Sequence, residues 1–232
     1  MTTTLTPAEV LDAGRERPIL FSAPMVRAIL AGTKTQTRRI VKPQPEYEDA
    51  AGLCWRGVAY GITTERRPYL GEFVKRCPYG APGDRLWVRE AFTHITGNGI
   101  RVHYRADGEP TDREGRVLPT EPGLRRWSPS IHMPRRASRI TLEVTRVRVE
   151  RLHDITEEDA RAEGVEAMDG MFDEVELCRI AKIAGSSYED ARGWFAALWC
   201  QINGAESWDA NPWVWVVEFK RMEAAARLRE AK

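Results

Sequence analysis

The segment from Gly32 to Arg39 holds the most concentrated set of side chains that could carry out chemistry. It contains one Lys, three Thr, one Gln and two Arg. A hydroxyl becomes a nucleophile when a neighbouring base takes its proton, and a lysine whose pKa is lowered by burial can act as that base. Arginine side chains bind anions and polar base edges. The segment therefore suits catalysis or ligand binding, although a solvated loop after a helix would have a similar composition.

The residues before this segment predict how it is held in place. Val26, Ile29 and Leu30 have the i, i+3, i+4 spacing of an apolar helix face, so a helix is expected over residues 24–31. Gly32 follows in the position where a glycine typically ends a helix. The polar and basic residues that come next are then expected to form a loop directly after the helix.

The remaining elements are expected at intervals along the chain. The clearest strand covers residues 139–150, where the apolar alternation shifts phase near Thr145 and Arg146, which predicts a β-bulge. Thr156 is expected to cap a helix that ends at Gly164. Shorter strands are expected at 18–21, 85–91, 100–105 and 213–219, and further helices at 171–184 and after Ser187.

The order of these elements predicts the fold class. Helices and strands do not alternate regularly, which argues against a doubly wound parallel sheet and predicts an α+β fold. The bulge in the long strand favours a small mixed β-barrel decorated by helices. One domain is expected over residues 18–222, with a flexible arm at 1–17 and a tail at 223–232. Two stretches, 43–80 and 106–138, are rich in Pro and Gly and are longer than ordinary loops between secondary-structure elements. They are expected to be functional or covering insertions.

The composition and the distribution of charge indicate which kinds of molecule the protein could bind. The chain has 232 residues, 42% of them hydrophobic, and a formal net charge of +1, so its overall charge predicts no partner. The charge is uneven, however. Residues 27–42 contain basic residues and no acid, whereas residues 140–190 carry fourteen acids against six bases. One part of the surface is therefore expected to attract phosphate and another to repel it.

The four cysteines predict free thiols rather than a metal centre. No CxxC pair occurs and the spacings match no common zinc site, so neither a metal nor a cofactor is expected. A metal site that combines Cys77 with His103 or His132 is the alternative. Residues 1–17 lack the apolar run of a signal peptide, and no stretch approaches the length of a membrane span. A cytoplasmic protein without membrane contact is expected.

Several blocks of the chain resemble a known family, in the same order. Gly32, Lys34, Thr37 and Arg39 resemble the signature of the ASCH family, which belongs to the PUA-like superfamily. Further blocks resemble that family's Gly-Asp turn, central strand, following helix and closing strand; these are residues 83–88, 140–144, 155–160 and 215–219. The chain as a whole resembles the longer ASCH proteins of phages and prophages. The resemblance implies a PUA-like β-barrel that acts on or binds a nucleoside or RNA.

One small bacterial member of this superfamily is an N4-acetylcytidine amidohydrolase, whose proposed site residues match Lys34, Thr37 and Glu163 here. Glu163 is carried over by its place seven residues after Thr156. The resemblance implies an amidohydrolase acting on N4-acylated cytidine or a related modified base. Thr37 would attack the amide carbonyl, and a neutral Lys34 would act as the base. Glu163 would orient Lys34 or keep it charged, and the sequence leaves both roles open.

Two further sets of residues are candidates for binding a modified nucleoside or RNA. The first set shares the Gly32–Arg39 segment and comprises Thr35, Gln36, Arg38 and Arg39. The second set, Trp127, Arg135 and Arg136, lies in the second insertion and combines an aromatic ring with basic groups suited to base stacking and phosphate contact. A non-catalytic RNA-binding module and a ribonuclease are the alternatives to the amidohydrolase. No protein partner is predicted.

Overall fold

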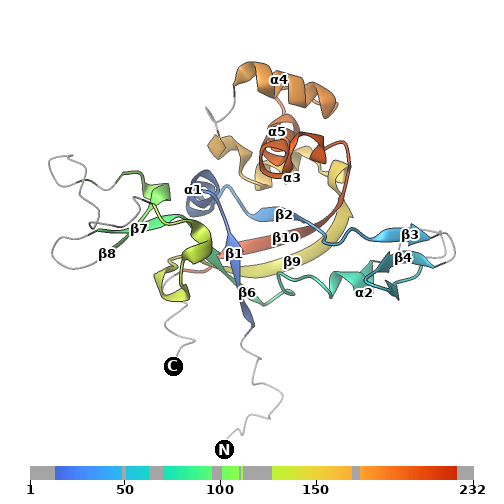
Figure 1. Ribbon diagram of the computed structural model, residues 1–232, viewed down its shortest axis with the longest axis horizontal. Helices are drawn as coiled ribbons and strands as arrows, with labels where there is room; N and C mark the ends of the chain where they lie inside the picture. Colours follow the sequence, from blue (N-terminus) through green and yellow to red (C-terminus); the bar gives the residue numbers. More distant parts are fainter. Residues whose placement is uncertain are drawn as a thin grey trace, which may run out of the picture.

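The computed structural model describes residues 14–48, 51–62, 70–95, 101–109, 111, 127–168 and 173–223. At its centre lies a curved, five-stranded mixed sheet in the order β1-β6-β9-β10-β2 (Figure 1). The strands of this sheet are β1 (Glu16–Leu20), β6 (Arg85–Arg89), β9 (Thr141–Arg151), β10 (Trp213–Arg221) and β2 (Gln36–Ile40). The α+β class predicted from the sequence is therefore confirmed.

Helices connect and cover the strands of this sheet. A short helix, α1, joins β1 to β2, and three further helices lie together above β2 and β10 (Figure 1). The helices are α1 (Ala23–Ala31), α3 (Glu157–Ala162), α4 (Glu174–Ile183) and α5 (Ala191–Asn203). In the part of the chain that the structure describes, none of the helices has the length and apolar character needed to cross a membrane.

Strand β10 is buried on both faces because two hydrophobic clusters meet across it. Trp215 and Val217 belong to a first cluster with residues of β6, β9 and α1. Val214 and Val216 belong to a second cluster with residues of α3, α4 and α5. Alternate apolar residues of β10 thus fill one core, and the residues between them fill another.

The β-bulge predicted in the long strand is confirmed. Glu218 of β10 pairs with Arg146 of β9, and the next residue, Phe219, pairs with Val144. Thr145 is therefore the extra residue that has no partner in β10. A bulge bends its strand and raises the local twist, which fits the curvature of β9 and β10 around the first cluster (Figure 1).

The segment after α1 corrects the loop prediction, because Gln36–Ile40 is strand β2 at one edge of the sheet. β2 pairs antiparallel with β10, and Arg38 lies opposite Val216. Local sequence does not reveal this strand, since its residues are mostly polar and its partner is distant in the chain. Pairing with a strongly apolar strand decides the conformation instead. As a strand, β2 sends alternate side chains to opposite faces.

Two expected element boundaries are also shifted. β1 begins at Glu16, inside the expected arm, because it pairs in parallel with β6 from that residue onward. α5 begins after Asp190 rather than Ser187, because the Asp190 carboxylate accepts a hydrogen bond from the Ser187 N–H and closes a turn there. Residues 1–13 and 224–232, the remainder of the expected arm and tail, lie outside the described residues.

The first insertion folds into a small sheet of its own. Its three strands pair antiparallel in the order β3-β4-β5, and a short helix follows (Figure 1). These elements are β3 (Glu46–Glu48), β4 (Gly52–Trp55), β5 (Val58–Ala59) and α2 (Gly71–Val74). A separate hairpin of β7 (Phe92–Ile95) and β8 (Arg101–Tyr104) precedes the second insertion, of which residues 106–109, 111 and 127–138 are described.

The described strands of the central sheet do not close into a barrel. β1 and β2 stay at its two edges, and each pairs with a single neighbour in that sheet. Strong bending of β9 and β10 curls the sheet without joining these edges (Figure 1). The mixed α+β architecture is established, whereas the PUA-like barrel stays a prediction.

Leu142 offers a test of the first core. Its side chain on β9 is fully buried, with 0% exposure. Leu142→Ala is expected to lower the free energy of unfolding by about 2–5 kcal/mol, because it removes buried methyl groups and leaves a cavity. Urea titration followed by circular dichroism measures the change. Val175→Ala, at a side chain 77% exposed on α4, is the control and is expected to shift stability by no more than about 0.5 kcal/mol. Equal effects of both substitutions would contradict this packing.

Candidate functional site

Lys34 and Glu163 meet where the lead-in to β2 runs antiparallel to the end of α3. Gly32 ends α1 in the left-handed conformation, with a φ of 83°, and lets the chain turn back. Lys34 and Glu163 then form an isolated antiparallel β-bridge. Beside it, the N–H of Thr35 donates to the carbonyl of Ala162 at 2.9 Å. The backbone therefore brings together two residues that are 129 positions apart in the chain.

This close approach depends on a glycine directly after Glu163. Gly164 has a φ of 80°, a conformation that other residues rarely adopt. A Cβ at this position would lie 2.8 Å from the Cβ of Lys34 and 2.9 Å from the Cβ of Ala28. Any side chain here would push the lead-in to β2 away from α3.

The two side chains form a buried ion pair. The Lys34 Nζ donates to the Glu163 carboxylate at 2.8 Å and to the Glu163 carbonyl oxygen at 2.7 Å. Lys34 is 2% exposed and Glu163 is 3% exposed. Burial lowers the pKa of Lys34, and the Glu163 carboxylate opposes that shift. The protonation of the lysine is thus coupled to the carboxylate beside it.

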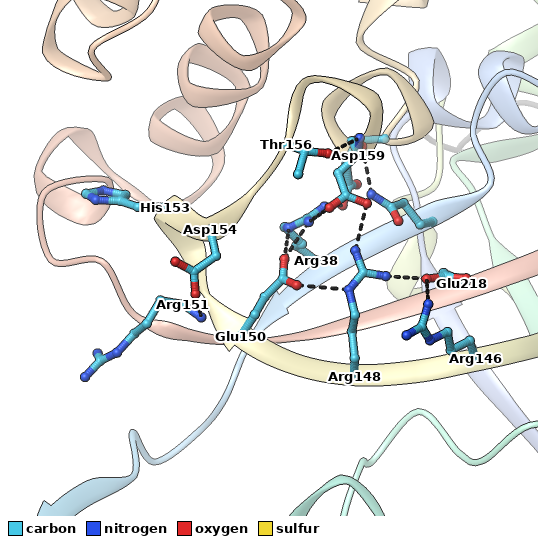
Figure 2. A network of polar contacts seen from close by, with 12 residues as sticks. Arg38, Arg146, Arg148, Glu150, Arg151, His153, Asp154, Thr156, Asp159 and Glu218 are labelled. Carbon is cyan, nitrogen blue, oxygen red and sulfur yellow. Dashed lines mark hydrogen bonds and ion pairs between the residues drawn. The ribbon is translucent and has the colours of Figure 1, made fainter. Parts of the chain in front are cut away.

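Arg38 lies at the centre of a larger polar network on the helix-covered face of β2 (Figure 2). Its guanidinium donates to Glu163 at 3.2 Å, to Asp159 at 2.9 Å and to Glu150 at 2.5 Å. The Arg38 side chain has no exposed surface. One buried cation therefore links β2, β9 and both ends of α3.

Arg148 of β9 supplies the second cation that these carboxylates need. It donates to Glu150 at 2.9 Å and to Asp159 at 2.7 Å, and it also bonds Glu218 of β10 (Figure 2). The hydroxyl of Thr156 accepts a hydrogen bond from the Asp159 N–H at 3.1 Å, so the predicted helix cap is confirmed. Burial alone would raise the pKa of Asp159, but the two guanidinium groups hold it below its usual value.

Thr37 and Arg39 point to the other face of β2, away from Arg38. Both line a cavity of about 390 Å³ at the edge of the sheet, which Arg38 and Glu163 also line. Among the described residues the Thr37 hydroxyl has no hydrogen-bond partner. A hydroxyl and a carboxylate therefore share one concave site, whereas Lys34 is absent from its lining and is bonded to Glu163.

Most of the cavity wall comes from three separate parts of the chain, which are β2 with its flanks, the first insertion and α5. Met25, Glu163 and Trp215 add to it from α1, the end of α3 and β10. Five aromatic residues line it: Trp55, Tyr79, Phe195, Trp199 and Trp215. Five basic residues also line it: Arg38, Arg39, Lys42, Arg56 and Arg76. The site thus combines apolar ring surfaces with a strong excess of positive charge.

Of the remaining residues that the sequence suggested for ligand binding, two lie near the polar network and three lie away from the cavity. The Gln36 amide donates to the Asp159 carbonyl at 2.7 Å and so belongs to the polar network, while Thr35 is exposed beside it. Trp127, Arg135 and Arg136 do not line the cavity. The ring of Trp127 lies 6.0 Å from that of His103 near the β7–β8 hairpin, and Arg136 is exposed. Arg135 pairs with Glu16 of β1, at the opposite edge of the sheet from β2.

The first insertion and α5 contribute residues to the cavity that the sequence did not predict. Trp55, Arg56, Arg76 and Tyr79 all come from the insertion. The unusual length of this insertion indicated a functional or covering element. Its residues follow no regular helix or strand pattern, so no particular side chain could be chosen. On α5, Phe195, Leu198 and Trp199 are buried and also form part of the cavity wall.

Within the described ranges, no three His, Cys, Asp or Glu side chains gather in a way that would hold a metal ion. The four cysteines are free thiols. No protein-family model, no curated protein and no solved structure matches the chain. The resemblance to the ASCH family therefore stays a prediction from the quoted residues.

Lys34→Met tests the buried ion pair. Removing one partner of a buried pair leaves an uncompensated charge, so the free energy of unfolding is expected to fall by about 3 kcal/mol, with Arg38 still holding Glu163. Lys75→Met is the matched control, because its pair with Glu72 is exposed and is expected to contribute less than about 1 kcal/mol. Chemical denaturation of both variants measures the difference. A Lys34 variant as stable as the Lys75 variant would contradict a structural role for the pair.

Asp159→Asn tests the electrostatics of the polar network. A carboxyl whose pKa is lowered by folding contributes stability above its unfolded pKa, and that contribution is lost as the pH falls through the folded pKa. The wild-type chain is therefore expected to be more stable than the variant near neutral pH. The difference should shrink between about pH 5 and pH 2. Urea titrations across this range measure it, and a constant difference would refute the assignment.

Proposed function

We propose that this protein is a hydrolase that removes the acyl group from N4-acylated cytidine or from a related modified base. The observation that carries the proposal is that Thr37 and Glu163 line one cavity while Lys34 is bonded to Glu163. These are the three residues that the resemblance to the amidohydrolase implies. Their meeting is informative because Glu163 is more than a hundred residues away from the other two.

The cavity has a suitable size and lining for a nucleobase. Its volume of about 390 Å³ falls in the usual range of small-molecule sites, roughly 300–1,000 Å³. Tyr79 is partly exposed in its wall and offers a ring for a base to pack against. Aromatic rings are the common surface on which proteins stack single bases.

The reaction proposed here uses Thr37 as the nucleophile. Its oxygen adds to the acyl carbon of the substrate, and Glu163 takes the hydroxyl proton. The bond from carbon to the exocyclic nitrogen then breaks, and the amine leaves with the proton from Glu163. Water hydrolyses the threonyl ester, so the products are the free base and a carboxylic acid. Arg39 lines the same cavity and offers positive charge to the developing oxyanion.

Lys34 has a supporting role in this scheme rather than that of the base. It does not line the cavity, and its Nζ donates twice to Glu163. These bonds, with that from Arg38, fix the orientation of the carboxylate. Because Lys34 is paired with Glu163 as a cation, it takes no proton in this scheme and instead holds the carboxylate in place for the proton transfer.

Membership of the ASCH family, a PUA-like fold and a cytoplasmic location are parts of the same proposal. In support, the helix before β2, the bulged strand β9, the capped helix α3 and the closing strand β10 follow one another in the expected order. A non-catalytic RNA-binding module is the second candidate function, and the basic lining of the cavity favours it. A ribonuclease remains the third.

Thr37→Val is the sharpest test of the proposed chemistry. Since the Thr37 hydroxyl has no partner among the described residues, this nearly isosteric change should leave the fold intact. Turnover of N4-acetylcytidine, followed by chromatography of released cytidine, is expected to fall by about a hundredfold or more. Thr35→Val, two residues away on an exposed side chain outside the cavity, is expected to keep full activity.

The outcome separates the candidate functions. Absence of turnover by the wild-type chain on any acylated cytidine would refute the amidohydrolase. RNA binding with a steep decrease in affinity as salt rises, without turnover or cleavage, would then support the binding module. Appearance of RNA fragments without added metal would instead support the ribonuclease.

A further inference from the structure

Four basic side chains around the cavity have no acidic partner. Arg39, Lys42, Arg56 and Arg76 line it, and none of them forms an ion pair within the described part of the chain. Arg39 donates instead to the carbonyl of Leu20 at 2.6 Å. Their positive charge is therefore available to a ligand.

The acidic residue of the cavity does not neutralise this charge. Glu163 is the one carboxylate among the described lining residues, and Lys34 and Arg38 already bind it at 2.8 Å and 3.2 Å. Arg38 is itself occupied by Glu150 and Asp159. Four like charges around a cavity repel one another when it is empty, and an anion between them relieves that repulsion.

One of these basic side chains, Arg56, contacts the backbone of another, Lys42, at the cavity wall. The Arg56 guanidinium donates to the carbonyl of Lys42 at 3.2 Å and stacks over the ring of Trp55, with 4.3 Å to the ring centroid. Arg56 occupies the tight turn between β4 and β5 with a φ of 50°. Arg56, Lys42 and Arg76 are all exposed, so they can reach a charged group that extends out of the cavity.

We propose that Lys42, Arg56 and Arg76 form a phosphate subsite, and that the ligand of the cavity is a nucleotide rather than a free nucleoside. The base would lie toward Thr37 and Glu163, as the proposed function requires, and the phosphate would lie among the three basic side chains. Arginine and lysine together are well suited to a phosphate, which offers several charged oxygens as acceptors. The orientation of the base rests on the proposed function, but phosphate binding does not depend on turnover.

Calorimetric titration of the full chain with cytidine and with cytidine 5′-monophosphate tests this inference. The nucleotide is expected to bind at least about tenfold more tightly, since bonds to a charged group are stronger than those to a neutral one. The preference should weaken as salt rises, and inorganic phosphate should compete. A short cytidine oligonucleotide without terminal phosphate distinguishes the source: binding as tight as that of the nucleotide indicates backbone phosphates, whereas weaker binding indicates a terminal phosphate.

Variants identify the residues that bind the phosphate. Arg56→Ala and Arg76→Ala are each expected to weaken nucleotide binding about tenfold and to leave cytidine binding unchanged. Arg27→Ala is the matched control, because Arg27 is exposed on α1 and does not line the cavity. Thermal unfolding checks that all three variants fold.

Equal affinities for cytidine and its monophosphate, binding of neither ligand, or an unchanged preference in the double variant Arg56→Ala/Arg76→Ala would overturn the inference. Failure of the proposed function gives a different result: a phosphate preference that depends on Arg56 and Arg76, without deacylation. Deacylation of N4-acetylcytidine without any phosphate preference would overturn this inference alone.

Discussion

The buried ion pair between Lys34 and Glu163 is the interaction on which the rest of the site depends. Two charges removed from water are tolerated only when each compensates the other, so the pair requires the lead-in to β2 and the end of α3 to stay together. The β-bridge between the same residues and the glycine at 164 make that approach possible. The pair thereby holds the end of α3 beside the lead-in to β2, where the Thr35 N–H donates to the Ala162 carbonyl.

β2 contributes residues to two environments. Gln36 and Arg38 face the helices and complete a polar network in which cations and carboxylates alternate (Figure 2). Thr37 and Arg39 face a cavity. Arg38 and Glu163 take part in both environments, because Arg38 binds the Glu163 carboxylate and both residues also line the cavity. The rigid network therefore fixes the group to which we assign the proton transfer, as catalysis by preorganised side chains requires.

The first insertion supplies many of the aromatic and basic side chains that line the cavity at the edge of the central sheet. Its small sheet and the helix α2 carry Trp55, Arg56, Arg76 and Tyr79 to one side of the cavity, opposite α5. The aromatic groups favour a flat ligand, and the basic groups favour a charged one. The combination agrees with a nucleotide better than with either a free base or an inorganic anion.

Much of the local structure was predictable, because it depends on neighbouring residues. The end of α1 at Gly32 and the cap at Thr156 follow from the conformations that these residue types prefer. The bulge at Thr145 follows from the alternation of apolar residues along this strand, which changes phase at that point. The segment that holds Lys34 and Thr37 also stood out by its residue types, and the resemblance to the ASCH signature singled out these two residues.

Only the tertiary structure decided the parts that depend on distant contacts. The strand β2 owes its conformation to pairing with β10 near the other end of the chain, and a short polar segment carries no sign of that partner. Without the strand, nothing directs the side chains of Arg38 and Arg39 to opposite faces. The cavity wall likewise combines segments that are far apart in the chain. Their meeting in space produces no repeating pattern in the sequence, so it could not be predicted from residue spacing.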